Sequence, residues 1–225
     1  MTNVDKALEF IRDDQAIGLG SGHASERFIR ALGERVRAGL RVHGVPTSRG
    51  SAALAAEVGI PLATLAEAMP LDLTVDGADE VDPHLNLIKG YGRALVREKI
   101  VAAASRQLII LVGPEHISDK LVQVLGARGK LPVEVVPFGL ALCRERLKQL
   151  GYPAEPLMER NQLFVTDNGN HILECRVSAI RDPRALDEEL KAIPGVVGTG
   201  LFIDMAHVVV IQDGNKVEIR TRPNI

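Results

Sequence analysis

The chain has 225 residues, 46% of them hydrophobic and 25% charged, which is the composition of a globular protein with one large domain or two small ones. Its 27 basic and 29 acidic side chains leave a net charge of −2, so the charge gives no reason to expect a nucleic-acid or membrane partner. No apolar run approaches the ~20 residues of a membrane span, and the N-terminal pattern is an amphipathic helix without the apolar region of a signal peptide.

Two cysteines, Cys143 and Cys175, show no CxxC spacing. We therefore expect buried, reduced thiols and a cytoplasmic protein.

The first part of the chain alternates helix and strand patterns. Helices are predicted over 4–12, 25–37, 50–58 and 93–104, and strands over 15–19, 40–45, 71–75 and 107–112. The strand at 107–112 (QLIILV) is apolar on both faces, as in a parallel sheet covered by helices. The βαβα order predicts a doubly wound, mostly parallel, Rossmann-like α/β sheet.

The pattern changes near Lys130. Strands that alternate apolar and polar residues are predicted over 132–138, 161–166 and 171–176, with the last two forming a hairpin around the turn DNGN. Helices are predicted over 140–150 and 187–192. Strands over 206–211 and 216–220 are expected to return to the first sheet. These patterns predict a Rossmann-like domain of residues 1–129 plus 204–225, with a smaller α+β, ferredoxin-like domain of residues 130–203 inserted near the C-terminus.

A glycine-rich segment, GLGSGHAS, occupies Gly18–Ser25 between a strand and a helix. Glycines allow a close approach to a ligand, and free amides at a helix N-terminus attract phosphate. The hydroxyls of Ser21 and Ser25 can add donors. The segment is neither a Walker motif nor a GxGxxG motif, so a tight turn without a ligand remains an alternative.

A second strand ends in VPTS, which includes Thr47 and Ser48. Ligands of open α/β sheets bind at the carboxyl ends of strands. The competing interpretation is a turn in which a hydroxyl caps the next helix, and the segment alone favours that interpretation.

The segment DGADEVD, Asp76–Asp82, places four carboxylates after a strand. Asp76 and Asp79 bracket a Gly-Ala pair, so both can face one crevice. A solvated acidic turn and a divalent-metal site are the alternatives, and the nearby Lys89 argues against the metal.

Lys89 opens the glycine-rich turn KGYGR before a helix that contains Glu98. Helical spacing puts Glu98 near Leu95 and Val101, where partial desolvation makes a carboxylate a better general base. An exposed glutamate paired with Arg93, Arg97 or Lys99 is the alternative.

The six histidines form no zinc pattern, and no GxSxG nucleophile motif is present. We expect neither a metal nor a cofactor.

Several motifs together resemble those of the ribose-5-phosphate isomerase type A family. They match in order along nearly the whole chain: GLGSG at 18–22, GVPTS at 44–48, DLTVDGADEVDPHLNLIKGYGRALVREKIVA at 72–102, PVEVVPFG at 132–139, TDNGN at 166–170 and PGVVGTGLF at 194–202. The family interconverts ribose 5-phosphate and ribulose 5-phosphate through a cis-enediolate without a metal.

The resemblance implies a role for each matching residue. Glu98 is implied as the base that moves a proton between C1 and C2, and Lys89 as the group that stabilises the enediolate oxygen. Asp76 and Asp79 are implied to bind hydroxyls and to help open the furanose ring. The implied substrate-binding set is Gly20, Ser21, Gly22, His23, Ala24, Thr47, Ser48, Gly77, Ala78, Gly90 and Lys120. The family also suggests a homodimer or a dimer of dimers, with the smaller domain contributing to the contact.

Two segments depart from the family pattern. The loop that usually reads GTGSTA is GSGHAS here, and the turn KGGGGA is KGYGRA. His23 and Arg93 are hypothesised replacement donors for phosphate. An isomerase for another sugar phosphate and a catalytically silent sugar-phosphate sensor remain alternatives; retention of Asp76, Asp79, Lys89 and Glu98 argues against the sensor. A CoA transferase is not favoured, because this sequence has no convincing glutamate nucleophile in the setting expected for that class.

Overall fold

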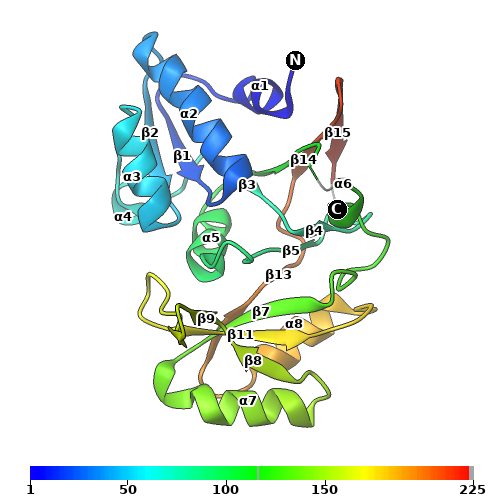
Figure 1. Cartoon of the computed structure of the whole chain (residues 1–225). Helices are drawn as coiled ribbons and strands as arrows, with labels where there is room; N and C mark the ends of the chain where they lie inside the picture. The colour runs from blue at the N-terminus through cyan, green and yellow to red at the C-terminus, as the bar shows by residue number, and fades with distance from the viewer. Residues whose placement is uncertain (116, 223–225) are drawn as a thin grey trace. The chain divides into compact units, whose positions relative to one another are not determined.

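The computed structural model describes residues 1–115 and 117–222 (Figure 1). The chain divides into two compact units. The first takes its described residues from Met1–Ala78, Arg97–Lys120 and Asp204–Ile225, and the second consists of Asp79–Val96 and Leu121–Ile203. Compared with the predicted domains, segments 79–96 and 121–129 pack with the second unit, because Ile88 and Leu125 join its apolar core. Whether the units behave as the predicted domains stays a prediction.

The first unit contains a six-stranded sheet in the order β15-β14-β6-β3-β1-β2. All neighbouring pairs are parallel except β14 and β15. The mostly parallel sheet and the return of the last two strands to it are therefore confirmed. Its strands are β1 (Gln15–Leu19), β2 (Val42–Pro46), β3 (Leu73–Gly77), β6 (Leu108–Val112), β14 (Val208–Asp213) and β15 (Lys216–Thr221).

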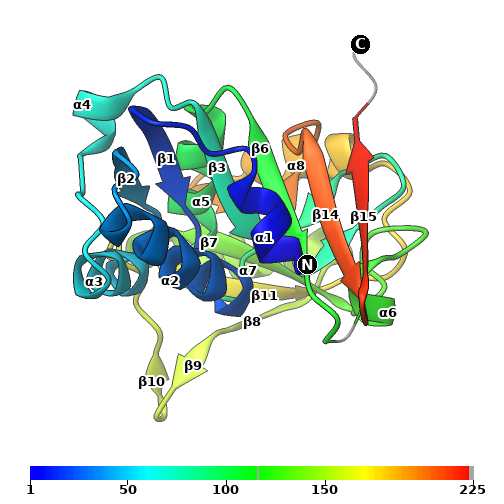
Figure 2. The same cartoon turned by 90° about the horizontal axis from the view of Figure 1, so that it is seen from above.

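Helices cover both faces of this sheet. Figure 2 shows α1 and α2 over one face, where Phe28 and Ile29 of α2 join Ile17 and Leu19 of β1 in the main core. Val101 of α5 packs in a smaller cluster with Val45 and Leu71. The helices associated with the first unit are α1 (Asn3–Leu8), α2 (His23–Arg37), α3 (Arg49–Glu57), α4 (Leu65–Ala68), α5 (Leu95–Ala103, whose first two residues belong to the second unit) and α6 (Ile117–Lys120).

The second unit is built on an antiparallel sheet in the order β12-β7-β11-β8, with the chain order β7-α7-β8-β11-α8-β12. This is the arrangement of a ferredoxin-like fold. Leu147 of α7 and Leu190 of α8 share one core with Val133 and Leu173, so both helices cover the same face. The elements are β7 (Lys130–Val135), α7 (Leu140–Gln149), β8 (Ala154–Pro156), β11 (His171–Arg176), α8 (Pro183–Lys191) and β12 (Val196–Thr199).

A smaller, three-stranded sheet in the order β13-β5-β4 completes the second unit. Its strands are β4 (Glu80–Val81), β5 (Leu87–Ile88) and β13 (Leu201–Phe202). A two-stranded ribbon, β9 (Met158–Glu159) with β10 (Gln162–Leu163), extends from the ferredoxin-like part.

The predicted hairpin of 161–166 with 171–176 is wrong. β10 pairs with β9, and β11 pairs with β7 and β8. The turn itself exists, but the buried carboxylate of Glu134 holds it by accepting hydrogen bonds from Thr166, Asn168 and Asn170. The strand predicted to reach Phe138 ends at Val135, and a 3₁₀ turn, η1 (Pro137–Gly139), follows.

Candidate active site

Two neighbouring strands of the first unit end beside each other and supply a cluster of hydroxyls. Ser21 follows β1, and Thr47 and Ser48 follow β2. The Ser21 Oγ lies 2.8 Å from Thr47 Oγ1 and 2.7 Å from Ser48 Oγ. Because the carboxyl ends of parallel strands meet at one edge of a sheet, residues far apart in sequence form this cluster.

Asp76 lies at the end of β3 in the same cluster and is only 1% exposed. Its Oδ1 accepts hydrogen bonds from the Ser21 amide (3.2 Å), the Ser25 hydroxyl (2.9 Å) and the Gly77 amide (2.8 Å). Three donors on one oxygen hold the carboxylate in one orientation. The carboxylate is therefore fixed in orientation by the loop that carries the candidate phosphate contacts.

Gly20 is required by this packing. A Cβ at position 20 would lie 2.2 Å from Asp76 Oδ1, a distance that real side chains do not tolerate. A glycine is therefore needed at position 20 because the backbone there lies against the Asp76 carboxylate, and a tight turn alone does not account for it.

The capping interpretation of VPTS is confirmed for Ser48. Its hydroxyl accepts from the Ser51 amide at 3.0 Å and caps α3. The same hydroxyl contacts Ser21, so capping and membership of the hydroxyl cluster coexist.

The other predicted residues of the first unit are placed less centrally. Gly22 is the N-cap of α2, with a φ of +89° and no side-chain cap, which leaves amides at the helix start without a capping side chain. The His23 side chain is 97% exposed and its Nδ1 lies 3.7 Å from Glu26 Oε2. Ala24 is buried next to Gly77. Lys120 ends α6.

Glu98 lies in α5 and is 2% exposed, so the interpretation as an exposed, surface-paired glutamate is wrong. Val101, one turn later, lies where a Cβ on Gly18 would touch it. Farther along, Ser105 shares a hydrogen bond with Thr74 of β3 and forms an isolated β-bridge with Leu71, two residues before that strand. Because α5 runs from the carboxyl end of β3 toward the amino end of that strand, Glu98 lies near the carboxyl end of β3, where Asp76 is found.

In the second unit, a short hairpin carries Asp79 and Lys89. Asp79 precedes β4 and Lys89 follows β5, and the two strands pair antiparallel, so both residues stand at the open end. Lys89 is only 3% exposed; its amide donates to the Gly200 carbonyl at 2.8 Å, and its Nζ lies 5.5 Å from the centre of the Phe202 ring. Lysine side chains are rarely buried to this extent in proteins, so the burial of Lys89 marks it as a candidate functional residue.

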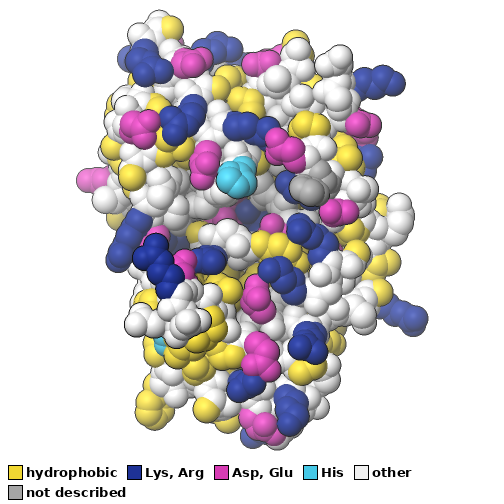
Figure 3. All heavy atoms as spheres, in the orientation of Figure 1, with side chains coloured by type: hydrophobic (Ala, Val, Ile, Leu, Met, Phe, Trp, Pro, Cys, Tyr) yellow, Lys and Arg dark blue, Asp and Glu magenta, His cyan; other side chains and the backbone are white. Residues whose placement is uncertain are grey.

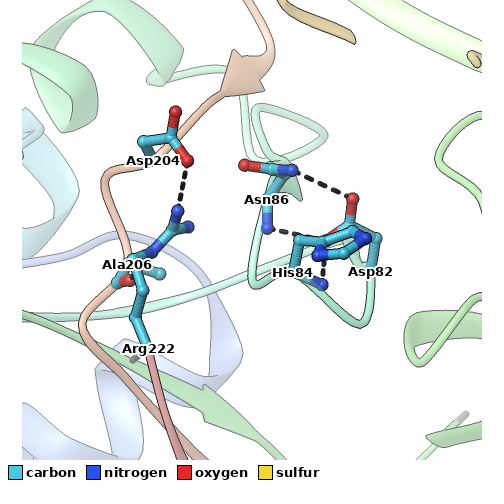
Figure 4. Close-up of polar contacts among 6 residues, drawn as sticks. All are labelled: Asp82, His84, Asn86, Asp204, Ala206 and Arg222. Atoms are coloured by element: carbon cyan, nitrogen blue, oxygen red, sulfur yellow. Dashed lines mark hydrogen bonds and ion pairs between the residues drawn. The ribbon is translucent and has the colours of Figure 1, made fainter. Parts of the chain in front are cut away.

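The closed end of this hairpin is tied by Asp82 (Figure 4). Its Oδ1 accepts from the amides of His84 and Asn86, both at 2.8 Å, and its Oδ2 accepts from the Asn86 side chain at 3.1 Å. These bonds set the turn and thereby the register that brings Asp79 level with Lys89.

The acidic cluster is therefore not a solvated turn. Glu80 is fully buried and accepts from the amides of Gly126 and Arg128 at 2.6 and 2.8 Å. Across residues 1–115 and 117–222, no group of three or more His, Cys, Asp or Glu side chains is arranged to hold a metal ion. In the same described residues, no helix is long and apolar enough to cross a membrane.

Gly90 and Tyr91 continue from Lys89. Gly90 has a φ of +105°, which a glycine adopts readily. The Tyr91 amide donates to Asp79 Oδ2 at 2.9 Å. Sequence patterns missed this contact, since a main-chain donor leaves no mark in the sequence. Asp76 and Glu98 thus belong to the first unit, and Asp79 and Lys89 to the second.

Comparison with known proteins gives one consistent result. The model of the family described as ribose 5-phosphate isomerase A (phosphoriboisomerase A) matches residues 43–216. The chain is 47% identical to the ribose-5-phosphate isomerase A of Gloeobacter violaceus, over 98% of this chain and 94% of that protein. It is 48% identical to that of Roseiflexus castenholzii, over 92% and 88%.

Solved structures agree with the sequence relatives. A D-ribose-5-phosphate isomerase in complex with phospho-erythronic acid superposes with a TM-score of 0.92 at 40% identity, covering 98% of this chain and 96% of that one. The ribose 5-phosphate isomerase from Plasmodium falciparum gives a TM-score of 0.91 at 34% identity, with coverages of 97% and 95%. The chain belongs to the ribose 5-phosphate isomerase A family.

Proposed function

We propose that the chain interconverts D-ribose 5-phosphate and D-ribulose 5-phosphate through a cis-enediolate, as an aldose–ketose isomerase of the non-oxidative pentose phosphate pathway. The observation that carries this proposal is the burial of Glu98 and Lys89, at 2% and 3% exposure. A buried carboxylate and a buried ammonium are costly to keep, and this reaction needs one base and one cation. The relatives named above, all ribose-5-phosphate isomerases, favour this substrate over another sugar phosphate.

Glu98 acts as the base. Its carboxylate removes the proton from C2 of the open-chain aldose and returns it to C1, while a proton moves from the C2 hydroxyl to the C1 oxygen. Atoms balance, because substrate and product are isomers. One base serves both carbons since they are adjacent on one face of the enediolate.

Lys89 stabilises the negative charge that develops on the enediolate oxygens. Stabilisation of developing charge by a fixed donor is normally a large contribution, about 10²–10³ in rate per donor. Its tether to Gly200 and its contact with Phe202 support a fixed position.

Asp76 and Asp79 bind substrate hydroxyls and assist opening of the furanose ring. Both carboxylates are already oriented by amides, Asp76 by Ser21 and Gly77, and Asp79 by Tyr91. Groups that are held before substrate arrives lose less entropy on binding.

The substrate's phosphate and hydroxyls are proposed to meet the amides of residues 20–24, the hydroxyls of Ser21, Thr47 and Ser48, and the chain near Gly77, Ala78 and Gly90. His23 contributes its main-chain amide at the start of α2, since its imidazole is exposed beside Glu26. Lys120 is proposed as a further phosphate-side cation. No cofactor is required.

The test is a coupled assay of ribose 5-phosphate isomerisation in the presence of EDTA, with wild type, Glu98→Gln and the matched control Glu26→Gln, an exposed glutamate of α2. We expect EDTA-resistant activity, loss of at least about 10²-fold in kcat for Glu98→Gln, and wild-type kcat for Glu26→Gln. Activity that requires metal, or that survives Glu98→Gln, contradicts the mechanism. Turnover of arabinose 5-phosphate but not ribose 5-phosphate would favour the alternative isomerase.

We also propose a cytoplasmic homodimer or dimer of dimers. The free, buried Cys143 and Cys175 fit a reducing compartment. Both charge signs are interspersed over the face in Figure 3, so no single-sign patch stands out there. We propose that the exposed apolar side chains of the second unit contribute to this contact: Val136, Phe138, Leu142, Val165 and Val197. Sedimentation of wild type and Phe138→Ser tests the dimer; a monomeric wild type contradicts it.

A further inference from the structure

Tyr91 occupies a cage of cations and main-chain oxygen in the second unit. The Arg128 Cζ lies 5.0 Å and the Lys130 Nζ 4.3 Å from the centre of its ring, and its hydroxyl donates to the Lys130 carbonyl at 2.9 Å. Cations over an aromatic face attract it electrostatically. Burial, with Glu80 and Asp79 nearby, raises the pKa of the Tyr91 phenol above its ordinary value, so the hydroxyl remains a donor.

The two cations are themselves anchored. The fully buried carboxylate of Glu80 accepts hydrogen bonds from the amides of residues 126–128, which fixes the backbone of Arg128. Lys130 begins β7, and its Nζ pairs with Glu174 at 2.8 Å. The ring of Tyr91 therefore packs on two residues whose backbone is held by Glu80 and by β7.

The main chain of Tyr91 connects this cage to the candidate active site. Its amide donates to Asp79 Oδ2 at 2.9 Å. Because Tyr91 stands between Gly90 and Gly92, whose backbone is free to adopt many conformations, the anchored ring restricts where this amide can lie. We infer that Tyr91 is a positioning residue that holds the Asp79 carboxylate in its working orientation. The inference rests on the proposed function, which gives Asp79 its role with substrate.

The experiment compares Tyr91→Ala, Tyr91→Phe, Asp79→Ala and the double variant Tyr91→Ala/Asp79→Ala. Tyr152→Ala is the matched control, since Tyr152 is the other tyrosine and packs on the same core. We expect Tyr91→Ala to lower kcat/KM about 10- to 100-fold, as a misplaced group does. Tyr91→Phe keeps the ring beside the two cations and should retain most of the wild-type kcat/KM. Tyr152→Ala should lower the Tm but not kcat/KM.

The double variant separates positioning from general support of the fold. If Tyr91 acts through Asp79, its replacement has no further effect on kcat/KM once Asp79 is alanine. Equal kcat/KM for wild type and Tyr91→Ala overturns the inference, and so does a full, additive loss in the Asp79→Ala background. If wild type itself does not isomerise ribose 5-phosphate, the proposed function fails instead.

A fluorescence experiment tests the inference without Tyr91→Ala, in case that variant does not fold. The chain has two tyrosines and no tryptophan, so Tyr152→Phe leaves Tyr91 as the only strong fluorophore. Phospho-erythronic acid, the ligand named for the related isomerase structure, is the probe. We expect its binding to change the Tyr91 emission in Tyr152→Phe, and this change to be lost in Tyr152→Phe/Asp79→Ala at saturating probe. Emission that does not respond to bound probe overturns the inference.

Discussion

Two glycine-rich segments, one in each unit, carry candidate site residues, and they are held in different ways. The segment Gly20–Ser25 relies on close backbone packing: its amides and small hydroxyls surround Asp76, and Gly20 leaves no room for a side chain. The segment Lys89–Arg93 relies on large side chains, with Tyr91 caged by Arg128 and Lys130 and with Arg93 paired to Glu159.

This difference shows what the two departures from the family pattern do. His23 enters the first segment but its side chain is directed to solvent, so the packing around Asp76 is kept. Tyr91 and Arg93 enter the second segment and make contacts with the rest of the second unit. The first segment therefore tolerates substitution only at positions whose side chains point to solvent. The second segment is instead held in place by the two large side chains, Tyr91 and Arg93, that replace the family's glycines.

Lys89→Met gives the largest expected effect in the second segment. Methionine fills similar space without the charge, so we expect kcat to fall by about 10²–10³-fold. The coupled assay measures it, with Lys191→Met, an exposed lysine paired to Asp187, as the control. A kcat within threefold of wild type would mean that Lys89 does not stabilise the enediolate.

Gly20→Ala against Gly92→Ala tests the contrast between the segments directly. A Cβ at position 20 collides with Asp76, whereas a Cβ at position 92 meets nothing within 4 Å. We expect kcat/KM to fall about 10- to 100-fold for Gly20→Ala and to remain at the wild-type value for Gly92→Ala. Equal effects of the two variants would remove the distinction.

Arg93→Gly is expected to change little. Arg93 has a φ of +72°, which costs a non-glycine residue about 1 kcal/mol. Its ion pair with the exposed Glu159 and its stacking over Phe164, at 4.8 Å, return a similar amount, about 1 kcal/mol. We expect a Tm within about 4 °C of wild type and an unchanged KM. A KM raised tenfold would instead support Arg93 as a phosphate donor.

His23→Ser is the smallest expected effect. Because the imidazole is exposed and the proposed contact is the main-chain amide, KM for ribose 5-phosphate should stay within about twofold of wild type. Steady-state kinetics measure it. A marked rise in KM would assign the phosphate contact to the imidazole.

The sequence patterns predicted the sheet of the first unit well, because strands such as 107–112 carry their burial in their composition. They failed at the predicted hairpin. β10 instead pairs with β9 across a two-residue turn, Arg160–Asn161, and arginine at positive φ is not a usual signal of such a turn. Nothing near Leu163 indicates that the distant, buried Glu134 holds the turn that follows. The candidate site shows a similar limit. The sequence shows a glutamate at position 98, but its burial depends on how α5 packs against the sheet.

The central claim is that the Glu98 carboxylate carries the proton between C1 and C2, and isomerisation in D₂O followed by proton NMR tests it most directly. We predict that wild type introduces deuterium at C1 of ribulose 5-phosphate while Glu98→Gln, with an unchanged Tm, gives neither product nor deuterium uptake on that time scale. Product formation or deuterium uptake by Glu98→Gln at the wild-type rate would contradict the claim.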